Sequence, residues 1–311
     1  MNTDNEKLGI LIYIITLLSF AAMEALAKNL SGAFTVSQIV WARYTFHFLI
    51  IIIVVMSLEL LGYKSGLKFP KLIKTQILRS ISLLLMTYCF FTSLSKLSLA
   101  EATIILFVSP LITTILAPLI LKEKVTSTSW VAVLIGFVGM VIVIGPSNII
   151  GFSTIDMYWL SGILYGIAGA LFYSLYQIGT RVLATVEPAL TSLLFSGAAG
   201  LLGTTFLVLI NYDPASGMQA WKAPNIIEWC FLITVGLFGA IGQFLILGAY
   251  AKAKAITLAP ISYTHIIWAT LFGYFFFSSI PEIQTCLGAI LIVGSGIYTF
   301  NKIEYKKYIN K

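Results

Sequence analysis

The stretch LGILIYIITLLSFAAMEALA, residues 8–27, is an apolar run in which Glu24 carries the one charge. An α-helix rises 1.5 Å per residue, so about 20 apolar residues cross the roughly 30 Å hydrocarbon core of a bilayer. This stretch therefore predicts a membrane-spanning helix at the start of the chain.

Nine further runs of similar length and composition follow it, at residues 36–61, 76–95, 99–121, 128–146, 159–180, 189–210, 226–250, 256–278 and 283–301. The chain of 311 residues is 59% hydrophobic and 10% charged, whereas soluble domains carry about 25% charged residues. We therefore expect one all-α membrane protein with ten transmembrane helices and no large soluble domain.

The basic residues fall in alternate gaps between these runs. With the N-terminus in the cytoplasm, fifteen of the 19 Lys and Arg residues lie on the inner side, three lie outside (Lys28, Lys96 and Lys222), and Arg43 lies within a span. The positive-inside rule then places both termini in the cytoplasm, with residues 302–311 as a basic tail. The net charge of +7 thus reports topology and contact with anionic lipids, not nucleic-acid binding.

The N-terminal run has one alternative interpretation. Lys7, the apolar run and Ala25-Leu26-Ala27 resemble a cleavable secretory signal. Glu24 before that triplet and the nine later spans favour a retained first helix.

The loop at 147–158 divides the chain into two halves of five spans, residues 1–146 and 159–301. Because five is odd, the second half enters the membrane in the opposite direction to the first. Related halves would then form inverted repeats, an arrangement common in secondary transporters.

Polar groups inside a bilayer are costly, so those within the spans are the best candidates for a site. They are Glu24, Arg43, His47, Glu101, Gln243 and His265. Glu24 and Arg43 fit either a structural ion pair or a pair for which substrate or protons compete. Glu101 could instead end a helix at the headgroup level, and His47 could instead bond a backbone carbonyl.

Two further groups of residues qualify as site candidates. Pro110 should kink its helix beside Ser109, which suits a hinge but also suits simple packing. Internal aromatic side chains could line a pocket for a planar or cationic solute, although any single one could face lipid: Tyr44, Tyr88, Tyr173, Tyr176, Tyr263 and Trp268.

Several classes of chemistry lack their motifs. There is no G-x-x-x-x-G-K-[ST] loop for ATP and no H-E-x-x-H stretch, and the three cysteines lie far apart without metal-ligand spacing. We expect no enzyme activity, no cofactor and no metal.

Several local stretches resemble one known family. They are Trp41-Ala42-Arg43-Tyr44, Leu97-Ser98-Leu99-Ala100-Glu101-Ala102-Thr103 leading to Ser109-Pro110-Leu111, Lys122-Glu123-Lys124-Val125, Tyr263-Thr264-His265-Ile266-Ile267-Trp268-Ala269, and Gly288-Ala289-Ile290-Leu291-Ile292-Val293-Gly294. The chain is similar to the EamA branch of the drug/metabolite transporter (DMT) superfamily. One departure is Ser278-Ser279 before Ile280-Pro281, where the family usually carries Gly-Glu.

The resemblance implies a ten-helix carrier of amino acids, their derivatives or other small metabolites, and some similar bacterial sequences look like carriers of S-adenosylmethionine. We expect a secondary-active transporter of the bacterial inner membrane that works by alternating access, driven by a proton or solute gradient or by exchange. Arg43 would attract a carboxylate, Glu24 would balance it or bind an amine, and His265 with Tyr263 would line the floor. A lipid flippase and a non-transporting membrane scaffold are the alternatives, and the oligomeric state stays open.

Overall fold

The computed structural model describes residues 3–63, 66–121, 127–144, 156–183, 186–214, 216–217, 219, 221–252 and 261–309. These ranges contain helices and no β-strand. The helices are α1 (Thr3–Leu30), α2 (Val36–Leu60), α3 (Ile73–Lys96), α4 (Leu99–Leu106), α5 (Ser109–Leu121), α6 (Ser127–Ile144), α8 (Met157–Leu183), α9 (Ala189–Leu209), α10 (Ile226–Lys252), α12 (Thr264–Phe277) and α13 (Ile283–Ile309).

The predicted spans fall on these helices. Seven helical segments are long and apolar enough to cross a membrane, one of them running through α4 and α5, and three shorter apolar helices lie in α6, α12 and α13. The ten-helix prediction is therefore confirmed. The start of the ninth span, at 256–260, lies outside the described residues. Residues 302–309, expected as a tail, continue α13 as helix.

The fourth span is interrupted. α4 ends at Leu106, Phe107 and Val108 form a turn, and α5 begins at Ser109. Pro110 thus falls in the first turn of a helix, where its missing N–H leaves no intrahelical bond unmade. The Ser109 carbonyl accepts a hydrogen bond of 2.8 Å from the Ser174 hydroxyl of α8. The kink expected beside Ser109 is in fact a complete break, and its role as a hinge stays a prediction.

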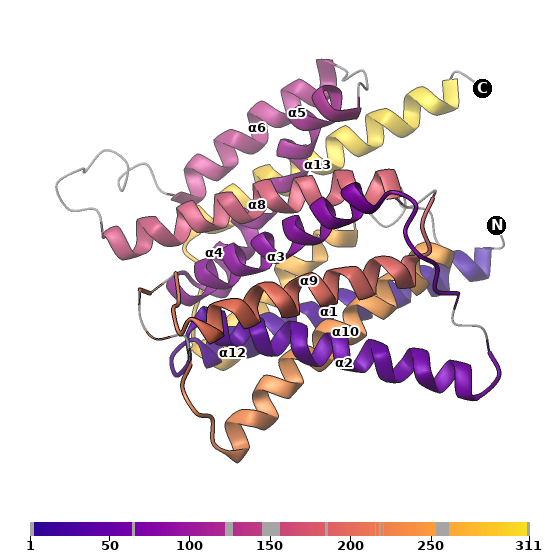
Figure 1. The fold of residues 1–311 in the computed structure, drawn as a ribbon. Coiled ribbons are helices and arrows are strands. Elements are labelled where there is room, and N and C mark those ends of the chain that lie inside the picture. The colour runs from indigo at the N-terminus through magenta and orange to yellow at the C-terminus, as the bar shows by residue number, and fades with distance from the viewer. Residues whose placement is uncertain are drawn as a thin grey trace.

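The helix contacts follow a two-fold pattern (Figure 1). α1 packs on α10 as α8 packs on α3, and α2 packs on α10 as α9 packs on α3. α1 packs on α12 as α8 packs on α4 and α5. Three pairs map onto themselves when the halves are exchanged, namely α2 with α9, α4 with α12 and α6 with α13. This is the contact pattern of two inverted five-helix repeats.

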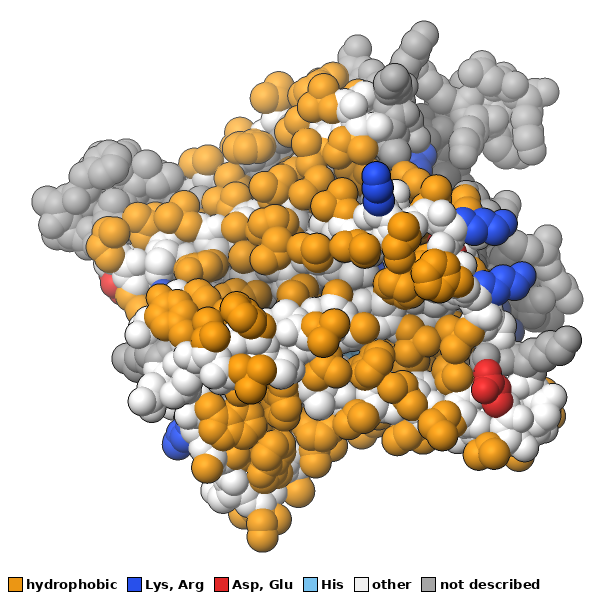
Figure 2. Space-filling view, viewed as in Figure 1, with side chains coloured by type: hydrophobic (Ala, Val, Ile, Leu, Met, Phe, Trp, Pro, Cys, Tyr) orange, Lys and Arg blue, Asp and Glu red, His pale blue; other side chains and the backbone are white. Residues whose placement is uncertain are grey.

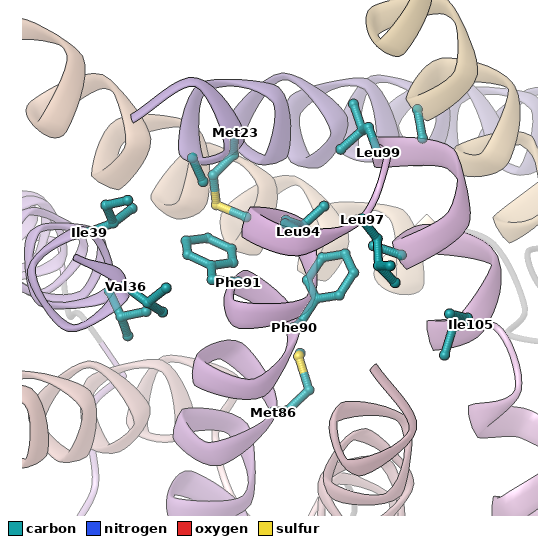
Figure 3. Close-up of a cluster of buried hydrophobic side chains, with 14 of the residues drawn as sticks. Met23, Val36, Ile39, Met86, Phe90, Phe91, Leu94, Leu97, Leu99 and Ile105 are labelled. Atoms are coloured by element: carbon teal, nitrogen blue, oxygen red, sulfur yellow. The ribbon is translucent and has the colours of Figure 1, made fainter. Parts of the chain in front are cut away.

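The buried apolar core is centred on α3 (Figure 3). Its Met86, Phe90, Phe91 and Leu94 lie among residues of three other helices, including Met23 of α1, Val36 and Ile39 of α2, and Leu99 and Ile105 of α4. Because this core covers one face of α3, the polar groups on that face are held inside the protein.

The outer surface is largely apolar, as a lipid-facing surface must be. Figure 2 shows hydrophobic side chains over the visible flank, and exposed examples include Ile53, Leu78, Leu164, Leu202 and Phe275. Both termini lie at one end of the bundle (Figure 1), and most of the visible Lys and Arg side chains in Figure 2 lie at that end. We call it the inner end and the opposite one the outer end.

Candidate functional site

A small cavity of about 10 Å³, roughly the space for one water molecule, lies between α2, α3, α9 and α10. It is lined by Arg43, Tyr44, His47, Leu83, Leu193, Ser196 and Gln243. Four of these, Arg43, Tyr44, His47 and Gln243, were predicted from the sequence as site residues. The structure therefore brings one group of the predicted polar residues together in one place.

Arg43 is the charged residue of this cavity, and it is buried. Its Nη1 donates a hydrogen bond to the Thr87 hydroxyl of α3, and its guanidinium lies 5.1 Å from the centre of the Tyr44 ring and 5.6 Å from that of Phe91. The Tyr44 hydroxyl lies 2.8 Å from Thr87 Oγ1 and 3.2 Å from the carbonyl oxygen of Leu83. Thr87 thus positions both α2 side chains, and the aromatic rings face the cation with their electron-rich sides.

Glu24 and Arg43 do not form an ion pair, which corrects both interpretations, since each treated these two residues as a pair. Glu24 Oε2 lies 2.9 Å from His265 Nε2, and both side chains are buried. The two residues come from α1 and α12, so each half contributes one member. Glu24 is therefore paired with His265, whereas Arg43 donates to the neutral hydroxyl group of Thr87.

Three further candidates lie away from the cavity. Glu101 forms a capping box at the start of α4, because its carboxylate accepts from the Ser98 N–H at 2.9 Å while the Ser98 hydroxyl accepts from the Glu101 N–H at 3.2 Å. The Tyr263 ring packs against Phe107 at 5.4 Å. Trp268 packs against the cluster of Tyr13, Leu17 and Ala249, and its buried indole N–H has no hydrogen-bond partner among the residues that the structure describes.

The outer end is closed by the loop between α9 and α10. Asp213 of this loop is fully buried; its Oδ1 accepts from the Ser37 N–H (3.1 Å), the Ser37 hydroxyl (2.5 Å) and the Tyr88 hydroxyl (2.7 Å). Its Oδ2 accepts from the N–H and hydroxyl of Ser216. Burial alone would raise the pKa of Asp213, but the hydrogen bonds from Ser216, Ser37 and Tyr88 outweigh it and hold the pKa below its usual value. Tyr88 therefore fastens this loop and does not line the cavity.

The same loop is fixed to α2 at a second point. The side-chain amide of Gln38 donates to the Lys222 carbonyl at 2.7 Å and accepts from the Lys222 N–H at 3.0 Å. Trp221 of the loop packs edge-on against Trp41 with 5.3 Å between ring centres, and Trp229 lies against both. The loop is thus held by hydrogen bonds and by an aromatic cluster.

The inner end is closed around Arg79 of α3, which the sequence analysis assigned to the inner positive charge alone. Arg79 is buried; its Nε donates to Thr180 at 2.7 Å, and its Nη1 donates to the Ser192 carbonyl at 3.2 Å and to Ser196 at 2.9 Å. Nη2 donates to the Tyr176 hydroxyl at 3.1 Å. The guanidinium thus bridges α3 to α8 and α9, and it reaches Ser196, which lines the cavity.

Two aromatic candidates belong to this inner cluster. Tyr173 and Tyr176 stack with 5.9 Å between ring centres and an interplanar angle of 13°, and the Arg79 guanidinium lies 4.6 Å from the centre of the Tyr176 ring. The signal for this cluster was present in the sequence. Polar residues at 76, 79, 80 and 87 recur at three-, four- and seven-residue spacing, which places them along one face of helix 3.

No group of three or more His, Cys, Asp or Glu side chains capable of holding a metal ion occurs in the part of the chain that the structure describes. The chemistry available at the cavity is therefore that of guanidinium, imidazole, amide and hydroxyl groups, which bind and orient polar solutes.

Comparison with known proteins supplies the family. The model of the EamA-like transporter family matches residues 7–145 and 160–300, almost the whole chain. The chain belongs to this family. It is accordingly a multi-pass membrane protein of a family that includes transporters.

Three relatives illustrate the range of the family. The chain is 30% identical to a protein of Helicobacter pylori described as an uncharacterized transporter, over 93% of each chain. It is 26% identical to the S-adenosylmethionine uptake transporter of Rickettsia bellii, over 97% of each chain. It is 22% identical to the pseudopaline exporter of Pseudomonas aeruginosa, over 94% of this chain and 96% of that one. The relatives thus include both an importer and an exporter of small molecules.

Proposed function

We propose that this EamA-family protein is a secondary transporter of the bacterial inner membrane that moves a small polar metabolite by alternating access. The observation that carries the proposal is the cavity beside Arg43, which is enclosed by helices of both halves. Contacts between the halves close it at both ends, through Asp213 at the outer end and Arg79 at the inner end. We assign the halves to residues 1–146 and 159–301.

The substrate class follows from the lining. Arg43 would hold a carboxylate, His47 and Gln243 would hydrogen-bond neighbouring polar groups, and Tyr44 would pack against the rest of the solute. An amino acid, an amino-acid derivative or a solute like S-adenosylmethionine fits such groups. Polar side chains along α3 are buried against α8 and α9 while the outer flank is apolar. This arrangement favours an enclosed path for a solute over a path open to lipid.

The orientation rests on charge. The inner end carries the termini and most of the visible basic side chains, so we place it in the cytoplasm by the positive-inside rule. The Glu24–His265 pair joins the two halves within the membrane, and proton coupling would act there.

Uptake by the purified chain in liposomes tests the proposal. A panel of radiolabelled amino acids, amino-acid derivatives, nucleosides and S-adenosylmethionine would be offered with and without a proton gradient, and a fluorescent lipid analogue would be offered in parallel. We expect saturable flux of at least one polar solute and its loss in Arg43→Ala, with normal membrane insertion. Flux of the lipid analogue alone would refute the proposal, and undiminished flux in Arg43→Ala would remove Arg43 from the site.

A further inference from the structure

Two buried guanidiniums, those of Arg43 and Arg79, lie along one path without an acidic partner. Within the described residues, the hydrogen bonds of Arg43 and Arg79 go to hydroxyl groups and one carbonyl. The buried carboxylate nearest in the sequence, Glu24, is taken by His265. Glu187 at the inner end accepts from the backbone N–H groups of Lys71 and Leu72.

An uncompensated buried charge is unfavourable, and two of like sign in one site add mutual repulsion. Neutral hydroxyls and aromatic faces solvate a guanidinium in part, but they do not neutralise it. A site built this way binds most strongly to whatever brings negative charge to both positions. The charge balance of the path therefore selects an anionic solute.

The two guanidiniums lie at two different positions, and this bears on the kind of anion that would bind. Arg43 of α2 is hydrogen-bonded to Thr87 of α3. Arg79 precedes Thr87 by eight residues on α3, which places the backbones of these two α3 residues about 12 Å apart along the helix axis. The long side chains of the two arginines shorten this gap, since Arg79 reaches Ser196 at the cavity wall. A solute with an anionic group at each end, such as two carboxylates joined by a short carbon chain, would bring negative charge to both positions.

Two buried polar atoms of α3, three residues before Arg79 and one residue after it, are unsatisfied in the described part of the chain. The Gln76 side-chain nitrogen and the Ser80 hydroxyl are buried, share the helix face of Arg79 and have no hydrogen-bond partner among the described residues. Buried donors without partners are rare in proteins, and each costs free energy until something accepts from it. They add two donors to the surroundings of a second carboxylate.

We infer that the transported solute is a small dicarboxylate, an amino acid or amino-acid derivative whose two carboxylates are held by Arg43 and Arg79. This rests on the proposed transport function and narrows its substrate. Arg43 holds the carboxylate that is common to all amino acids, and Arg79 selects the second one. Arg79 then releases part of its contact with Thr180, Ser192 and Tyr176 when the solute arrives, which opens the inner end.

The test measures binding to the purified full-length chain by thermal shift, in which the stabilisation grows with the logarithm of the ligand concentration relative to its Kd. The probes are L-glutamate and L-2-aminoadipate with two carboxylates, L-glutamine as the neutral counterpart, and S-adenosylmethionine as the cationic one. We expect the dicarboxylates to bind roughly tenfold to a hundredfold more tightly than L-glutamine, the worth of one charge-assisted contact. This preference in the unaltered chain tests the inference without any variant.

Variants then assign the preference to a residue. Arg79→Gln should bring L-glutamate down to the affinity of L-glutamine and leave L-glutamine unchanged, whereas Arg79→Lys should keep a weaker preference and Arg43→Gln should weaken both ligands. Arg181→Gln is the matched control. Arg181 follows Thr180, a partner of Arg79, in the last turn of α8, and its side chain is exposed. This substitution should change the affinity for neither ligand.

Tighter binding of L-glutamine or S-adenosylmethionine than of the dicarboxylates would overturn the inference, and so would no stabilisation by either dicarboxylate. An equal loss of affinity for L-glutamate and L-glutamine in Arg79→Gln would also overturn it, because a purely structural role of Arg79 would give that result. Liposome flux separates this failure from failure of the proposed function. Transport of a neutral or cationic solute would leave the transporter standing and remove the dicarboxylate assignment, whereas no flux of any polar solute would end both.

Discussion

Replacing Asp213 with Asn should loosen the loop that closes the outer end. The carboxylate accepts five hydrogen bonds, of which two come from backbone N–H groups that cannot turn away, those of Ser37 and Ser216. Each of these two N–H groups uses a different carboxylate oxygen. An amide offers one oxygen, so one N–H would face an NH₂ group and lose its acceptor.

The magnitude follows from that count. A buried donor left without a partner costs about 1–3 kcal/mol, so Asp213→Asn should destabilise the closed loop by about that amount. Asp213→Ala removes the acceptor of both backbone N–H groups and should cost about 2–6 kcal/mol. Thermal unfolding in detergent measures the loss of stability in Asp213→Asn. The Trp41, Trp221 and Trp229 cluster reports the loop directly, because release of Trp221 into water should shift its fluorescence to longer wavelength.

Asp156→Asn is the matched control. Asp156 precedes α8, is exposed, and accepts from the Tyr158 N–H at 2.8 Å as a helix cap. Asn caps helices about as well as Asp, so stability should change by no more than a few tenths of a kcal/mol. Equal stability and unchanged fluorescence in Asp213→Asn would refute the reasoning, because the buried carboxylate would then hold nothing that an amide cannot hold.

The pH dependence of the closure has a definite sign. The pKa of Asp213 is lower when folded than when unfolded, so its stabilisation is fully present above the unfolded value and is lost as pH falls through the folded value. Unfolded aspartate titrates near pH 3.9. The difference in stability between the unaltered chain and Asp213→Asn should therefore be constant from about pH 5 upward and shrink below about pH 4.

The remaining predictions concern packing and the buried pair. A methyl group at Gly200 would overlap the Tyr44 ring, so Gly200→Ala should destabilise the protein by about 1–3 kcal/mol. Gly294 has open space around it, so Gly294→Ala should be neutral or stabilising by up to about 1 kcal/mol. Thermal unfolding curves of the two variants measure both effects. Glu24→Ala should cost about 1–3 kcal/mol by leaving the buried His265 ring without the hydrogen-bond partner that Glu24 supplies. A double-mutant cycle with His265→Gln would contradict the pairing if the two losses simply add.

The sequence predicted the spans well because length and apolarity decide them locally. It also located the irregularity at Ser109-Pro110, although as a kink and not as the complete break that separates α4 from α5. Glu101 carried a readable signal, because Ser98 three residues earlier is the pattern of a capping box.

Partners across the bundle were harder to predict. Glu24 and His265 are 241 residues apart, and no local pattern says which of several buried cations or imidazoles a carboxylate will meet. Arg79 was assigned to topology because a basic residue near an inner helix end satisfies the positive-inside rule, whatever else it does. Asp213 lies outside the spans, so a search for charge within them passed over it. These contacts are set by how the two halves pack, and charge counting along one chain does not contain that information.

One continuous helix takes part in both closures. α3 carries Tyr88 at the outer one and Arg79 at the inner one, nine residues or about 14 Å apart along its axis. A rod that tilts about its middle moves its two ends in opposite directions, so a contact that lengthens on one side shortens on the other. Such a coupled tilt would keep the pathway from being open to both sides of the membrane at once, and ions could not leak through it.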